Sequence, residues 1–129
     1  QLVQVANALE HIGDRIATGL VTSAQKRIEE EVQVSPQTAE VLNEFHEMVL
    51  TALSDAMKAV NKQDAILAKD VRQRRKMLSK YSRYVIEHGL DRLTADEPNR
   101  HRTYAREMEV MEIFDTVFST ARRIARTVN

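Results

Sequence analysis

The chain has 129 residues, with 19 Lys and Arg balanced by 19 Asp and Glu, and it has no cysteine. This length fits one domain with its own core, and the formal net charge of zero leaves no electrostatic footprint for binding nucleic acid in bulk. The lack of Cys excludes disulfides, thiolate metal sites and cysteine nucleophiles. Only three Gly and two Pro interrupt the sequence, which favours long helices joined by short turns.

Two helices are predicted in the first half of the chain. Apolar residues recur every three or four positions from about residue 2 to residue 34, which indicates one buried helical stripe. This stripe consists of Leu2, Val5, Leu9, Ile12, Ile16, Leu20, Ala24, Ile28 and Val32. Ser35 and Pro36 suit an N-cap and a first helical position, so a second helix begins there and runs to about Asn61. Its inward stripe is Val41, Phe45, Met48, Ala52, Ala56 and Val60.

Two more helices follow. Asp64 ends a polar break and caps a third helix over about residues 65–93, and a turn at residues 94–98 leads to a fourth helix that ends near Val128. Their inward stripes are Leu67, Val71, Leu78, Tyr81 and Val85 in the third, and Tyr104, Met108, Met111, Phe114, Phe118, Ala121, Ala125 and Val128 in the fourth. Short turns force neighbouring helices to run antiparallel. We therefore expect an all-α, up-down-up-down bundle of four long helices, as a single domain over residues 1–129.

Three polar residues flank the apolar stripe of the first helix: Asn7, Glu10 and Asp14. Steps of three and four place them on one helical face, where the two carboxylates repel each other by a few tenths of a kcal/mol. A divalent cation would offset this repulsion, because carboxylate oxygens are hard ligands. A base such as Arg15 would offset it as well, so these residues alone leave both interpretations open.

A second acidic pair lies on the fourth helix. Glu112 and Asp115 are three residues apart, and Asp115 flanks its apolar stripe much as Asp14 flanks that of the first helix. The first and fourth helices are neighbours in an up-down-up-down bundle, so the two acidic pairs are expected to face each other across that contact. Glu112 and Asp115 are therefore candidate metal ligands, with a solvated acidic face as the alternative.

Other charged residues have simpler interpretations. Asp55 and Arg74 fall on the apolar stripes of the second and third helices, which predicts a mutual ion pair. Two basic runs, residues 72–76 and 122–126, are expected to be solvated helix faces, with anion or headgroup binding as the alternative. No Glu is followed three residues later by a His, so the motif of bundle di-iron enzymes is missing. No phosphate-cradling loop or activated nucleophile is visible, and we expect no enzyme.

The stretch LEHIGDRI, residues 9–16, resembles the Leu-Glu-Arg-Ile-Gly-Asp signature of PhoU-like domains, and Asn7 precedes its Glu by three residues. The stretch KQDAILAKDV, residues 62–71, is similar to the start of the family's middle helix. The resemblance implies three-helix repeats with an E-x-x-x-D motif on the last helix of each. Residues 1–34 would then end a first repeat, and residues 36–129 would form a second.

The second repeat departs from the family pattern. When the two motifs are aligned, Asp115 takes the Asp position, Met111 takes the Glu position, and Glu112 comes one residue late. A chain with one good motif and one degenerate motif is most similar to the C-terminal cytoplasmic domain of bacterial sodium/phosphate cotransporters. The chain is accordingly expected to be part of a longer protein.

The resemblance implies a regulatory domain in phosphate homeostasis that binds a divalent or ferric metal ion through its acidic motifs. It places the domain in the cytoplasm, held at the inner membrane by a transmembrane portion outside this chain. The expected partners are that membrane portion and a second copy of the chain, and no nucleic acid. The alternative function is a metal-independent helical scaffold that dimerises or docks a partner.

Overall fold

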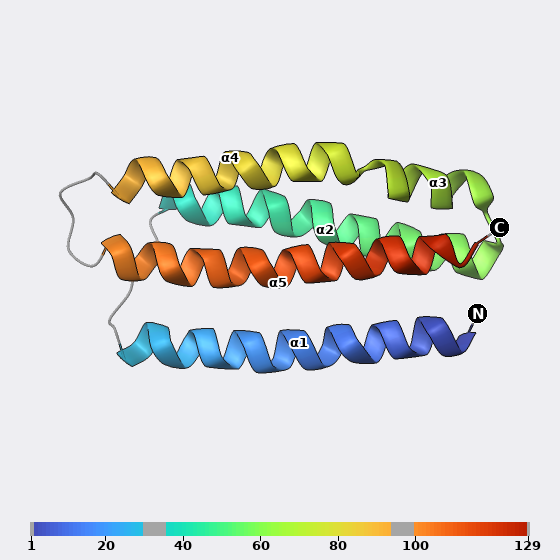
Figure 1. The fold of residues 1–129 in the computed structure, drawn as a ribbon, viewed down its shortest axis with the longest axis horizontal. Helices are drawn as coiled ribbons and strands as arrows, with labels where there is room; N and C mark the ends of the chain where they lie inside the picture. Colours follow the sequence, from blue (N-terminus) through green and yellow to red (C-terminus); the bar gives the residue numbers. More distant parts are fainter. Residues whose placement is uncertain (1, 30–35, 94–99, 129) are drawn as a thin grey trace.

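The computed structural model describes residues 2–29, 36–93 and 100–128, and helices make up nearly all of them (Figure 1). The helices are α1 (Leu2–Glu29), α2 (Pro36–Lys62), α3 (Ala65–Gln73), α4 (Arg75–Leu93) and α5 (Arg100–Arg126). Helices α3 and α4 follow each other along one side of the bundle, so these residues form four rods and contain no strand. The predicted all-α bundle is confirmed.

The helix ends follow the local signals in the sequence. Helix α2 begins at Pro36, as predicted, and ends at Lys62. Asp64 caps α3, because its carboxylate accepts a hydrogen bond of 3.0 Å from the backbone N–H of Leu67. Gln63 has a φ of 53°, which turns the chain between α2 and α3. The predicted end of the first helix and the turn at residues 94–98 lie outside the described residues.

The third predicted helix is interrupted at Arg74, which the sequence analysis did not anticipate. The backbone N–H of Arg74 bonds to the carbonyl of Val71 at 3.2 Å, a three-residue step that closes α3. The guanidinium of Arg74 lies 2.8 Å from the carboxylate of Asp55 and 2.6 Å from that of Asp70. The predicted ion pair of Asp55 and Arg74 is confirmed, and it ties the break between α3 and α4 to α2.

The core lies between α2, the α3–α4 rod and α5. All the other described helices contact α5. Helices α2 and α5 contact each other, and both contribute small core side chains with no exposed surface: Ala52, Ala56, Ala59, Ala121 and Ala125. These alanines let the two helix backbones approach closely.

Aromatic rings fill the part of the core nearer the start of α2. Phe45 is 1% exposed and stacks on Tyr81 of α4, with ring centroids 5.9 Å apart and planes 5° apart. Phe114 of α5 contacts the Phe45 ring as well, with ring centroids 5.9 Å apart. Phe45 therefore joins the three rods of the core.

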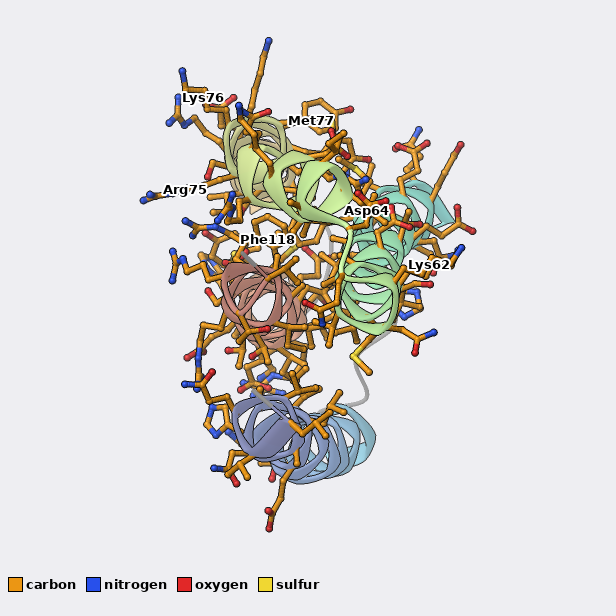
Figure 2. The ribbon with its side chains drawn as sticks, turned by 90° about the vertical axis from the view of Figure 1, so that its right-hand side faces the viewer. Lys62, Asp64, Arg75, Lys76, Met77 and Phe118 are labelled. Atoms are coloured by element: carbon orange, nitrogen blue, oxygen red, sulfur yellow. The ribbon has the colours of Figure 1, made fainter. Side chains whose placement is uncertain are left out.

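Helix α1 lies beside these three rods and runs antiparallel to α5 (Figures 1 and 2), and its buried residues extend the same hydrophobic cluster. Among the described helices, α5 is the only one that α1 contacts. Val5, Ala8 and Ile12 are buried, whereas Leu2 is 79% exposed and Leu9 is 38% exposed. The prediction that Leu2 and Leu9 belong to the buried stripe is wrong. A helix that packs on one neighbour buries only a narrow strip of its surface, and these two side chains lie outside that strip. The described bundle is a three-rod core with one added helix.

Candidate functional site

Asn7 and Glu10 of the acidic motif lie on the face of α1 that points away from α5. Ile12 belongs to the buried strip, and Glu10 is two residues away, which puts it roughly 160° around the helix. Asn7 and Glu10 are both exposed. The backbone at Asp14 continues this stripe, but its side chain lies outside the described part of the structure. Asn7 and Glu10 therefore face outward instead of flanking the helix contact.

The second acidic pair lies on a different side of the molecule. Asp115 lines a hollow of about 430 Å³ between α4 and α5, to which no described residue of α1 contributes. It is two residues from Ile113, which meets α1: a Cβ added at Gly19 would lie 2.8 Å from the Ile113 Cδ1 atom. Asp115 thus projects away from α1, and the structure does not bring it beside Glu10.

The metal ligands proposed from the sequence are accordingly split between two surfaces. Glu112 and Asp115 remain close to each other on α5, and the charge of Glu112 acts on Asp115. Within the described residues, no three His, Asp or Glu side chains gather as a metal-binding group. The side chain of Asp14 is not among those residues, so a metal site at the α1 motif stays a prediction.

The carboxyl group of Asp115 has a raised pKa. Desolvation in the hollow is the main cause, and the neighbouring Glu112 adds to it. A raised pKa means that the folded protein binds this proton more tightly than the unfolded chain. The resulting stability is fully present below the unfolded-state value, near 3.8, and is lost as pH rises through the folded-state pKa.

Asp115→Asn is therefore expected to stabilise the protein at neutral pH and to have no effect near the unfolded-state pKa or below it. The expected gain is only a few tenths of a kcal/mol, because the residue keeps much of its surface in solvent. Urea unfolding of both proteins at neutral pH and at about pH 3 measures this difference. A gain of the same size at both pH values would contradict the electrostatic origin.

Basic and hydroxyl side chains line the same hollow, and the sequence analysis did not connect them. Its polar lining apart from Asp115 consists of Arg75, Ser79, Ser82, Arg83, Ser119 and Arg122. The spacing of these residues in the sequence could have indicated the hollow. Steps of three and four residues align Arg75 with Ser79 on α4 and Ser119 with Arg122 on α5. The two basic runs, residues 72–76 and 122–126, contain arginines that are adjacent along the chain. Adjacent residues point in different directions on a helix, so these runs do not define the lining.

Comparison with protein-family models, with curated proteins and with solved structures finds no match to this chain. The resemblance to PhoU-like domains therefore rests on residues 9–16 and 62–71 and on the order of the helices. In the part of the chain that the structure describes, no helix has the length and apolar content needed to cross a bilayer.

Proposed function

We propose that this chain is a non-catalytic, PhoU-like regulatory domain of a sodium-dependent phosphate transporter, acting in phosphate homeostasis. The observation that carries the proposal is the packing of one helix on a three-rod core, with Asn7 and Glu10 facing outward. The resemblance implies one helix beside a three-helix unit, because α1 would be the last helix of a preceding repeat and α2 to α5 would form the next one. The domain would lie on the cytoplasmic side of the inner membrane, beside the transporter's transmembrane portion.

The outward position of the α1 motif suits a metal ion that links two surfaces. Glu10 and Asp14 offer at most four carboxylate oxygens, whereas a hard divalent cation takes about six ligands. Water or a second protein surface must supply the others, and the exposure of Glu10 leaves room for either. A metal held in this way would couple the domain to a partner, which is a regulatory role.

A second candidate function is a metal-independent scaffold that dimerises or docks a partner. Two apolar side chains at the start of α1 favour it: Leu2 is 79% exposed and Val3 is 71% exposed. Exposed apolar residues that lie together often mark interaction surfaces. Self-association that persists in a chelator would support this function.

The metal proposal is tested by thermal melts of the purified chain with Mg²⁺, Ca²⁺, Mn²⁺, Zn²⁺ or Fe³⁺. At least one ion is expected to raise the Tm, because a ligand at about 100 times its Kd stabilises the folded state by about 2.7 kcal/mol. The double variant Glu10→Gln/Asp14→Asn is expected to lose this gain. The control, Glu40→Gln/Glu47→Gln, removes two exposed carboxylates from α2 and should keep it.

Equal Tm gains in the wild-type chain and in the Glu10/Asp14 variant would overturn the metal site. No gain with any ion, together with self-association that ignores chelator, would favour the scaffold function instead. Elemental analysis of the purified protein adds an independent measure, because a stoichiometric metal lost only in the Glu10/Asp14 variant would assign the ion to this motif.

A further inference from the structure

The hollow between α4 and α5 is the second feature that suggests a binding function. We propose that this arginine–serine groove, defined by Arg75, Ser79, Ser82, Arg83, Ser119 and Arg122, binds the phosphate group of a small molecule. The inference does not rest on the proposed function, because the acidic motif of α1 contributes nothing to the groove. It rests on the charge, the donors and the size of the groove.

The first argument is the charge around Arg122. Burial lowers the pKa of its guanidinium, and the like charges of Arg126 and Arg75 lower it further. None of the ion pairs among the described residues involves Arg75, Arg83 or Arg122. Arg122 therefore lies beside two like charges with no described acid paired to it, so a bound anion would relieve the repulsion.

The second argument is an unused hydrogen-bond donor. The Nε–H group of Arg122 is buried and has no partner among the described residues. A buried donor without an acceptor is rare in folded proteins and costs free energy. A phosphate oxygen could accept this bond once the Arg122 side chain turns toward the groove, and the planar guanidinium suits phosphate because it can donate two parallel bonds.

The third argument is the arrangement of hydroxyl groups beside the arginines. Ser79 lies one turn after Arg75 on α4, and Ser119 lies one turn before Arg122 on α5, so both helices offer a cation with a neutral donor. Figure 2 shows Arg75 at the edge of α4, on the side of the bundle where blue side-chain nitrogens gather between α4 and α5. Tetrahedral oxyanions need several donors from different directions, which two facing helices supply.

The groove has space for more than an isolated phosphate ion. Its volume is about 430 Å³, within the usual range for small-molecule sites. Leu78 is 2% exposed and Phe118 is 8% exposed, and both belong to the lining. In Figure 2, Phe118 lies between α5 and the rod formed by α3 and α4. An apolar lining beside the cations suits a phosphate monoester, whose carbon part would rest on these side chains.

Asp115 is the one carboxylate in the lining, and it belongs to the other end of the groove. It is seven residues before Arg122 on α5, which separates the two positions by about 10 Å along the helix. An arginine close to Asp115 would lower the pKa of its carboxyl group, but only burial and Glu112 act on that pKa and both raise it, so Asp115 does not neutralise the cations. The phosphate position is therefore at the end formed by Arg75 and Arg122.

The test is a calorimetric titration of the purified chain with inorganic phosphate and, separately, with glycerol 3-phosphate. Saturable binding of at least one is expected. Arg122→Gln and Arg75→Gln should each weaken it about tenfold, because each removes a charged hydrogen bond. Arg102→Gln is the matched control, since Arg102 is an exposed arginine near the other end of α5 and should leave the Kd unchanged. Thermal melts establish that each variant is folded.

The two titrants separate the sources of the phosphate group. Tighter binding of glycerol 3-phosphate would identify a phosphate monoester as the ligand, whereas equal binding would mean that the groove recognises phosphate alone. Arg122→Lys keeps the charge but loses the planar fork, and it is expected to weaken binding too. No saturable binding of either compound at millimolar concentration, or equal weakening by Arg122→Gln and Arg102→Gln, would overturn the proposal.

Discussion

Phe45→Ala is expected to lower the free energy of unfolding by about 3–5 kcal/mol. The Phe45 ring is 1% exposed and contacts Tyr81 on α4 and Phe114 on α5, each with centroids 5.9 Å apart. Its removal leaves a cavity at the point where the three rods of the core meet. The surrounding helices are long and packed along their whole length, so they cannot collapse into the space without losing other contacts.

Urea unfolding followed by circular dichroism measures this loss. Tyr84→Ala is the matched control, because Tyr84 also contacts the ring of Tyr81, at 5.7 Å, but is 53% exposed. Its cost should stay below about 1 kcal/mol. Similar losses in both variants would contradict the central position of Phe45.

The second large effect is expected from adding volume where α2 meets α5. Ala56→Leu should cost about 1–3 kcal/mol, because Ala56 has no exposed surface and its helix packs against α5. A leucine there must push the two helix axes apart or take a strained rotamer. Leucine suits a helix as well as almost any residue, so local propensity cannot account for a loss.

Ser54→Leu provides the comparison, because Ser54 is an exposed position two residues away on the same helix. That change should alter the free energy of unfolding by no more than about 0.5 kcal/mol. Both variants are compared by thermal and urea unfolding. A neutral Ala56→Leu variant would mean that the contact between α2 and α5 is looser than the buried alanines indicate.

Local signals in the sequence predicted the helices well. Pro36 and Asp64 mark helix starts through their backbone geometry and hydrogen bonding, which depend on a few neighbouring residues. The pairing of Asp55 with Arg74 was also predictable, because each is a charged residue on an otherwise apolar stripe. In these cases the physical cause lies within one helix or one helix pair.

The remaining features depend on contacts that a single sequence does not reveal. The break between α3 and α4 at Arg74 occurs in a run of good helix formers. At this break Arg74 forms an ion pair with Asp55 on another helix. The sequence alone also could not predict whether Asn7 and Glu10 face the core or the solvent. Their position relative to the core depends on whether α1 packs on one helix or on two, and α1 packs on α5 alone among the described helices.

The attachment of α1 to a single helix has a consequence for the order of assembly. Helices α2, α3, α4 and α5 each contact at least three others among the described helices, whereas α1 contacts α5 alone. The contact of α1 with α5 joins distant segments, as Lys26 and Glu109 do across 83 positions. Losing this one contact leaves the contacts among the other helices intact, so it costs less than separating them. Helix α1 should therefore dock after the other three rods have formed, and detach before they separate.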